Sequence, residues 1–222
     1  MGTTIIRSDS SIQQAVLQEL KWDTRVEETD VGVEVDNGIV TLTGTVSSYA
    51  KKLAAVEAAH RVVGVRDVAN DIVVKVPGMA PTDTDIARAV RHALEWDVMV
   101  PHEHIQSTVT NGMVTLRGSV ERYSQKEDAD RAVRNLAGVQ AVINYIEIEY
   151  TPRPSAPELQ EAIEEALKRR AERTAEHIQV IAKDGVVTLR GHVNSWEERR
   201  AVAGLVRHAP GIREVKDELT YG

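Results

Sequence analysis

The stretch "NGIVTLTGTV" at residues 37–46 returns as "NGMVTLRGSV" at 111–120 and as "DGVVTLRGHV" at 184–193. Successive copies begin 74 and 73 residues apart. Repeat units of solenoid proteins are shorter, about 20 to 50 residues, so each copy is better interpreted as a small domain. We therefore predict three tandem modules over residues 8–76, 82–150 and 155–222.

A tight turn lies between two alternating apolar runs in each copy. In the first copy, apolar residues at every second position flank the pair Asn37-Gly38. Such a pair adopts positive φ at little cost, which predicts a β-hairpin. Gly44, within the second strand, indicates a bulge or a backbone that a helix approaches closely. The glycines expected to serve turns, helix ends or close packing are Gly38, Gly44, Gly64, Gly112, Gly118, Gly138, Gly185, Gly191 and Gly211.

Each copy opens with apolar residues four positions apart, a spacing that lays a stripe along one face of a helix. Ser155 with Glu158, and Thr82 with Asp85, have the spacing of a capping box. We expect helices to begin near residues 8, 82 and 155. The stripes are Ile12, Val16 and Leu20; Ile86, Val90 and Leu94; and Leu159, Ile163 and Leu167.

A second, alanine-rich helix follows the hairpin in the segment "SSYAKKLAAVEAAHRVVGV" at 47–65. We expect Leu53, Val56, Ala59 and Val63 on its buried face and Gly64 as its C-cap. One more strand closes each module. The order α-β-β-α-β predicts an α+β fold, in which a three-stranded mixed sheet carries both helices on one face. The aromatic residues expected to pack at the start of this helix are Tyr49, Tyr123 and Trp196.

The composition is that of a globular protein, with 42% hydrophobic residues, 27% charged residues and a net charge of −7. The charge is uneven, because residues 154–222 carry 11 Lys and Arg against 12 Asp and Glu, whereas residues 8–76 carry 7 against 11. No cluster of Lys and Arg with interleaved aromatic residues occurs, so nucleic acid is not an expected partner. The absence of cysteine excludes disulfides, thiolate metal sites and a thiol nucleophile.

The first residues, "MGTTIIRSDSS", lack the apolar run of a signal peptide, and no apolar segment is long enough to span a bilayer. We expect a cytoplasmic protein, or a periplasmic one if the chain is a processed form. No Walker A, G-x-S-x-G or H-E-x-x-H motif is present, and the polar residues shared by the copies are those of turns and caps. The sequence therefore predicts a binding or scaffolding protein and no enzyme.

Two features are candidates for docking to a membrane surface or to a protein partner. Trp22 and Trp96 end the first helix of the first and second copies, and an indole there suits a membrane interface or a partner anchor. The alternative is that each indole caps the core of its own module or packs on the adjacent module. The third copy instead places basic residues at that helix end, where they could meet anionic lipid: Lys168, Arg169, Arg170 and Arg173.

Other polar positions have simpler interpretations. Asn70, Asn144 and Asp217 recur at the start of the last strand, where we expect their side chains to satisfy local backbone groups. His102 and His104 would share one face of an extended segment, but a transition metal needs three or four ligands and no other copy supplies an aligned histidine. We therefore expect no bound metal of this kind.

The hairpin consensus, together with "GVRDVAN", "GVQAVIN" and "GIREVKD" before the last strand of each copy, resembles the BON (bacterial OsmY and nodulation) domain. The resemblance covers nearly the whole chain as three tandem copies. It implies a non-enzymatic module linked to osmotic stress, the cell envelope and phospholipid membranes. A cytoplasmic member with a single such domain binds potassium, which makes a potassium sensor the alternative function. A third hypothesis is self-assembly into homo-oligomers through exposed edge strands.

Overall fold

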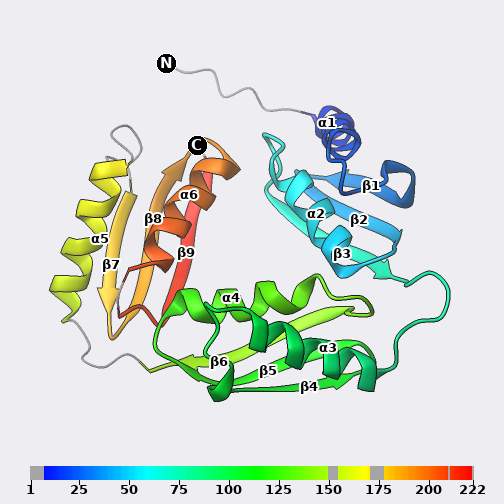
Figure 1. Ribbon diagram of the computed structural model, residues 1–222. Helices are drawn as coiled ribbons and strands as arrows, with labels where there is room; N and C mark the ends of the chain where they lie inside the picture. Colours follow the sequence, from blue (N-terminus) through cyan, green and yellow to red (C-terminus); the bar gives the residue numbers. More distant parts are fainter. Residues whose placement is uncertain (1–7, 150–154, 171–177, 210, 222) are drawn as a thin grey trace. The chain divides into compact units, whose positions relative to one another are not determined.

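The computed structural model describes residues 8–149, 155–170, 178–209 and 211–221. The chain folds as three successive α-β-β-α-β modules (Figure 1), here named modules 1, 2 and 3 for the described parts of 8–76, 82–150 and 155–222. The prediction of an α+β fold with this element order is confirmed. Residues 82–136 and 141–222 belong to one compact unit of the chain.

The elements have nearly the same lengths in each module. Module 1 has α1 (Asp9–Trp22), the 3-10 helix η1 (Glu28–Asp30), β1 (Val31–Asp36), β2 (Ile39–Val46), α2 (Tyr49–His60) and β3 (Asp67–Val74). Module 2 has α3 (Asp83–Trp96), the 3-10 helix η2 (His102–His104), β4 (Ile105–Thr110), β5 (Met113–Val120), α4 (Tyr123–Arg134) and β6 (Ala141–Ile148). Module 3 has α5 (Ala156–Arg170), β7 (Ile178–Lys183), β8 (Val186–Val193), α6 (Trp196–Arg207) and β9 (Glu214–Tyr221).

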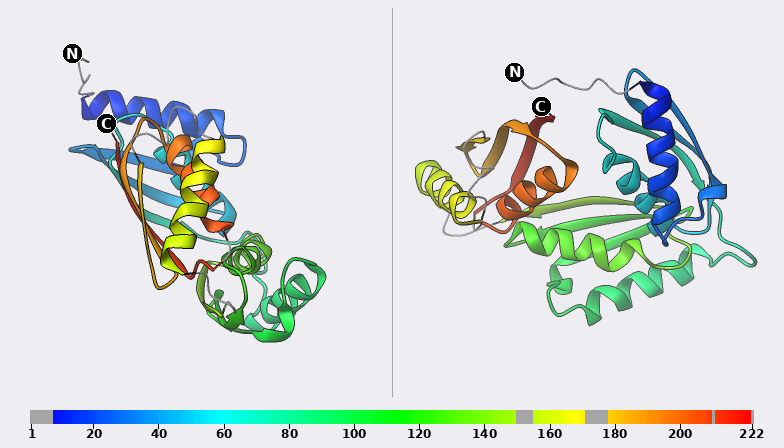
Figure 2. Two further views of the ribbon diagram at one scale, coloured as in Figure 1. Left: turned by 90° about the vertical axis from the view of Figure 1, so that its left-hand side faces the viewer. Right: turned by 90° about the horizontal axis from the view of Figure 1, so that it is seen from above.

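Each sheet is mixed, as the sequence predicts. In module 1 the order is β1-β2-β3, with β1 antiparallel and β3 parallel to the central strand β2. The register places Leu42 opposite both Val33 and Asn70. Modules 2 and 3 repeat this pairing. The two helices of a module cover one face of its sheet, which is where its apolar core lies (Figures 1 and 2).

The three hairpin turns have the backbone that the sequence predicts. Both central residues have positive φ, for example 51° at Asn37 and 78° at Gly38, which is the type I′ geometry that fits the twist of a hairpin. Gly44 and Gly118 have φ values of 120° and 132°. A Cβ at either position would overlap the carbonyl oxygen of Asp30 or His104. The close approach predicted here is therefore present, but the approaching backbone is the end of η1 or η2.

The first helices begin and face the core as predicted. Thr82 and Asp85 form a reciprocal capping box, and Ser155 and Glu158 bond in the same way. The apolar stripe of α1 is fully inside, with Ile12, Val16 and Leu20 each at most 3% exposed.

The second helix corrects one prediction. In module 1, α2 ends at His60 and its buried residues are Ala54, Ala55, Ala58 and Ala59. Of the predicted face, Ala59 is buried and Val56 packs partly buried against the core, but Leu53 and Val63 are not buried. Small side chains let the helix lie close to the sheet, so alanine occupies the contact and the larger residues turn toward its border. After His60 the chain tightens into short turns, Val63 is exposed, and Gly64 serves this turn and not the helix end.

The recurring Asn70, Asn144 and Asp217 lie on the edge strands β3, β6 and β9. Each side chain accepts a hydrogen bond from the backbone N–H two residues later, at 3.1–3.2 Å. The expectation that they satisfy local backbone groups is confirmed. These bonds also occupy N–H groups of an edge strand, which reduces its capacity to pair with another chain.

Candidate docking surface

Both tryptophans at the ends of the first helices point into solvent. Trp22 is 83% exposed and Trp96 is 75% exposed, so neither indole caps a core. The reason is helical geometry, because each indole comes two residues after the last buried leucine and is therefore rotated about 200° from the buried stripe. This spacing is readable from the sequence and would have predicted the exposure.

The loop after each tryptophan is fixed by an aspartate and a valine. The carboxylate of Asp23 accepts a hydrogen bond from the backbone N–H of Arg25 at 3.1 Å, and Asp97 accepts one from Met99 at 3.0 Å. Val26 and Val100 follow, and both are buried. The tight turn and the buried valine together hold the tip of each helix in place and leave its indole outside.

In module 1 this tip is covered by charge pairs. The guanidinium of Arg25 donates to Asp23 at 2.8 and 2.9 Å and to Glu57 at 3.2 Å, and Arg61 donates to Asp23 at 3.0 Å. The hydrogen bond from Arg25 is the main reason that the pKa of Asp23 lies well below its usual value, although burial opposes the shift. Trp22 is thus an exposed apolar side chain on a tip that also carries the charge pairs of Asp23 with Arg25 and Arg61.

In module 2 the same tip is apolar. Met99 and Asn135 stand where module 1 has Arg25 and Arg61. Val98 is 96% exposed and Met99 is 62% exposed, and both follow the exposed Trp96 within three residues of the chain. His92, one turn earlier on α3, has its ring 5.5 Å from that of Trp96. We name Trp96, Val98 and Met99 the apolar tip of module 2.

Module 3 has no tryptophan at this place. Lys168, Arg169 and Arg170 are the last residues of α5, a helix end that favours cationic side chains through the helix dipole. Their side chains, and Arg173 as a whole, lie outside the described residues. The predicted basic cluster therefore stays a prediction.

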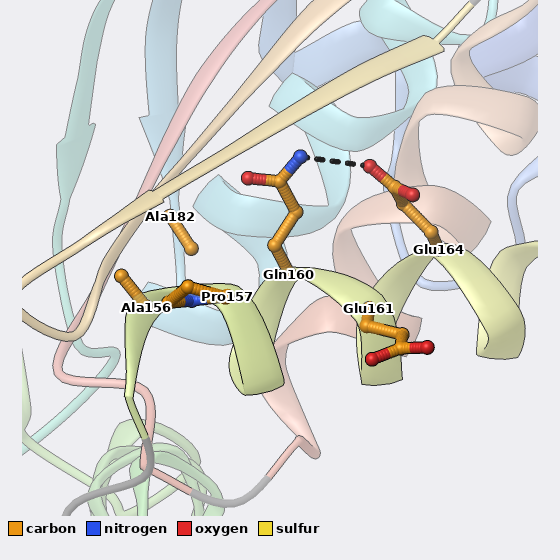
Figure 3. A pocket seen from close by; sticks show the side chains of 6 residues that line it. All are labelled: Ala156, Pro157, Gln160, Glu161, Glu164 and Ala182. Atoms are coloured by element: carbon orange, nitrogen blue, oxygen red, sulfur yellow. Dashed lines mark hydrogen bonds between the residues drawn. The ribbon is translucent and has the colours of Figure 1, made fainter.

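A shallow pocket of about 320 Å³ lies between α5 and β7 of module 3 (Figure 3). Ala156 and Ala182 line it, where module 1 has the larger Asp9 and Val35. Gln160 donates to Glu164 at 2.9 Å, whereas the equivalent Gln13 of module 1 donates to the carbonyl of Val33. The polar residues that line the pocket are acidic or neutral, so the pocket offers no cationic group to a phosphate.

The histidines singled out in the sequence do not form a metal site. His102 and His104 lie in η2, so the segment is a 3-10 helix and not the extended strand that would put both on one face. Among the described residues, no group of three or more His, Asp or Glu is placed to hold a metal ion. Potassium binding through backbone carbonyls stays a prediction. No helix within the described ranges is long and apolar enough to cross a membrane.

Comparison with known proteins points to one family. The BON domain model matches three segments, residues 8–76, 82–150 and 155–222. The osmotically-inducible protein Y of Escherichia coli K12 is 32% identical over 142 residues, which cover 61% of this chain and 70% of that protein. An uncharacterized protein from the gshII 5' region of Anaplasma centrale is 27% identical over 128 residues, or 55% of this chain and 84% of that protein.

Among solved structures, CdsD of the type III secretion system of Chlamydia trachomatis aligns over 96% of this chain and 93% of its own, at 15% identity. The TM-score is 0.26, and a second structure, of the C-terminal domain of CdsD, gives 0.27 at 14% identity. Scores this low carry no argument about function.

Proposed function

Because the chain belongs to the BON domain family, we propose that it is a non-enzymatic adaptor of the osmotic stress response that docks onto phospholipid surfaces. Its similarity to a protein named for osmotic induction supports the physiological setting. The apolar tip of module 2 is the observation that carries the docking, because three of the four residues from 96 to 99 are apolar and exposed.

An apolar tip of this kind suits a lipid interface. Trp prefers the headgroup region of a bilayer, where its ring is shielded from water and its N–H still finds a polar partner. Val98 and Met99 add exposed apolar area to the same loop, and the flexible side chain of Met adapts well to irregular surfaces. Large exposed apolar side chains that lie side by side mark interaction sites more often than single ones do.

Module 2 is the better anchor of the two modules that carry the tryptophan. Insertion of the module 1 tip would bring Arg25 and the partly exposed Glu57 toward the acyl chains, and a charge there costs several kcal/mol unless it stays in water. The module 2 tip has no charge at positions 98 and 99, although Arg131, the counterpart of Glu57, is charged and pairs with Asp128. Trp22 then acts as a secondary contact at the headgroups.

The lipid class follows from charge. A net charge of −7 opposes long-range attraction to an anionic bilayer. The basic residues Lys168, Arg169, Arg170 and Arg173 would compensate locally, each by about 1 kcal/mol near an anionic surface. Glu164, Glu165, Glu172 and Glu176 lie near them in the sequence and reduce this gain. We therefore expect apolar insertion to dominate and anionic lipid to contribute modestly.

The test is flotation with neutral and with 30 mol% anionic phospholipid vesicles, a composition of about one charged lipid in three. The variant Trp96→Ser/Val98→Ser/Met99→Ser should lose most of its binding to both vesicle types. Trp22→Ser should lose less, and reversal of the four basic residues to Glu should reduce binding to anionic vesicles only. Trp22, Trp96, Val98 and Met99 are all exposed, so circular dichroism should remain unchanged in the serine variants.

Absence of flotation by the unchanged protein would contradict lipid docking. Equal flotation of the triple variant would remove module 2 as the anchor. If the triple variant instead loses a protein partner while vesicle binding is absent, the tip is a protein-docking site and the lipid proposal fails.

A further inference from the structure

We infer that α4 of module 2 carries an interaction surface whose partner is module 3 of the same chain, so that modules 2 and 3 move as one rigid pair. Both modules lie in one compact unit. The surface consists of Tyr123, Lys126 and Glu127 on α4, and it faces Arg207 and Glu214 of module 3.

The apolar part of this surface is Tyr123. Its ring packs against the apolar core cluster of module 3, although Tyr123 is the first residue of a helix of module 2. Burial raises the pKa of the Tyr123 hydroxyl, and Arg207 of module 3 acts in the opposite direction. The equivalent Tyr49 of module 1 packs on the core of its own module. Tyr123 therefore has a different role from its counterpart in the repeat.

The polar part of this surface is the ion pair between Arg207 and Glu127, next to the partly buried Lys126. The guanidinium Nη1 of Arg207 lies 3.0 Å from Glu127 Oε1, and both side chains are about one-third exposed. Burial lowers the pKa of Lys126, while Glu214 of module 3 and Glu147 act to raise it. In the described residues, the Nε of Arg207 is buried without a hydrogen-bond partner. Because both side chains are more than one-third exposed, the ion pair alone contributes modestly, and its effect adds to the packing of the partly buried Tyr123.

The repeat shows that the acidic partner is specific to α4. Leu53 stands in module 1 and Arg200 in module 3 at the position of Glu127. Position 207 is basic in modules 2 and 3, with Arg134 as the counterpart of Arg207. In module 2, however, Arg134 pairs with Asp130 of its own helix. Only Glu127 thus offers a carboxylate at this position to another module.

The experiment measures the distance between modules 2 and 3 in the full chain. Because the chain has no cysteine, the exposed Thr108 and Lys216 can be changed to Cys and spin-labelled without side reactions. Electron-electron double resonance should then give one narrow distance distribution. Glu127→Arg and Arg207→Glu should each broaden it at least two-fold, and the double variant Glu127→Arg/Arg207→Glu should restore most of the narrow distribution.

Tyr123→Ala should broaden the distribution as well, and Tyr49→Ala is the matched control that should leave it unchanged. A broad distribution in the otherwise unchanged protein would overturn the inference. So would single charge reversals that leave the width unaltered in variants whose circular dichroism shows them to be folded. Because neither label lies at the apolar tip, this result is independent of whether the protein binds lipid.

Discussion

The carboxylate of Asp9, the first residue of α1, accepts a hydrogen bond from the backbone N–H of Gly38 at 2.9 Å. A second bond, also 2.9 Å, comes from Asn37, so one side chain secures both central residues of the hairpin turn to the start of the helix. Asp83 repeats the arrangement in module 2 with Asn111 and Gly112, at 2.8 and 2.9 Å. Module 3 has Ala156 at this position.

The hydrogen bonds from the hairpin turn to Asp9 and Asp83 predict that exchanging Asp and Ala at this position has opposite effects in different modules. Asp9→Ala and Asp83→Ala should each lower the stability of their module by about 1–3 kcal/mol, because two N–H groups lose a charged acceptor. Ala156→Asp should instead raise the stability of module 3 by about 1 kcal/mol. Urea unfolding followed by hydrogen exchange of each module measures both. Destabilisation by Ala156→Asp would show that the turn of module 3 is not arranged like the other two.

The ion pairs around Asp23 predict an acid-sensitive contribution to stability. The pKa of Asp23 is lowered in the folded state, chiefly by its hydrogen bonds from Arg25, so the contribution is complete above the unfolded pKa of about 4 and is lost as the pH falls further. Asp23→Asn should therefore cost about 1–3 kcal/mol at pH 7 and progressively less below pH 4. Thermal unfolding between pH 2 and 7 is the measurement.

Asp97→Asn is the matched control, because Asp97 occupies the same place but has Met99 and Asn135 where Asp23 has its two arginines. Its cost at pH 7 should be smaller than that of Asp23→Asn. If Asp23→Asn lowers the free energy of unfolding as much at pH 2 as at pH 7, the ion pairs of Asp23 are not the source of its contribution.

The glycines of the central strands predict a difference between strained and unstrained sites. Gly44→Ala and Gly118→Ala should destabilise their modules, because positive φ alone costs about 1–3 kcal/mol for a side chain and the Cβ would also meet a backbone carbonyl. Gly204→Ala, within α6 and with no atom near the added Cβ, should stabilise module 3 by about 0.5–1 kcal/mol. The melting temperatures of the three variants measure these effects. An unchanged melting temperature of Gly44→Ala would contradict the assignment of strain to this glycine.

The edge strands predict how self-association is suppressed. In module 1, Asn70 accepts from the N–H of Ile72 at 3.2 Å, and the ammonium of Lys52 donates to the carbonyl of Ile72 at 2.7 Å. Asn70→Ala should free that N–H and increase concentration-dependent association in sedimentation velocity. Lys52→Arg/Asn70→Asp should not increase association. It copies the Arg199–Asp217 pair of module 3, in which Nε of Arg199 lies 2.8 Å from Oδ2 of Asp217. Unchanged sedimentation of Asn70→Ala would show that this edge is not a route to oligomers.

Local sequence signals predicted most of the fold. Turn pairs such as Asn37-Gly38, and caps such as Thr82 with Asp85, act over a few residues, so they are visible in the sequence and are present in the structure. The buried face of α2 was mispredicted because tight packing against the sheet favours alanine over the larger Leu53. Periodicity alone does not report how closely two elements approach.

The candidate site depended more on contacts between distant residues. The bond from Arg61 to Asp23 joins residues 38 positions apart, so no local pattern indicates that one tip is charged and the other apolar. Tyr123 also packs against residues far from it in the sequence, those of the module 3 core. Exposure of Trp96 was predictable in principle from its two-residue distance from Leu94.

The most direct test of the docking function is the fluorescence of Trp96 alone, in the variant Trp22→Tyr/Trp196→Tyr, with vesicles that contain brominated phospholipid. Insertion of the apolar tip predicts a shift of the emission to shorter wavelength and strong quenching by bromines near the headgroups, with both effects abolished by Val98→Ser/Met99→Ser. Emission that stays at the wavelength of a water-exposed indole and is not quenched, at any vesicle concentration, would contradict the account.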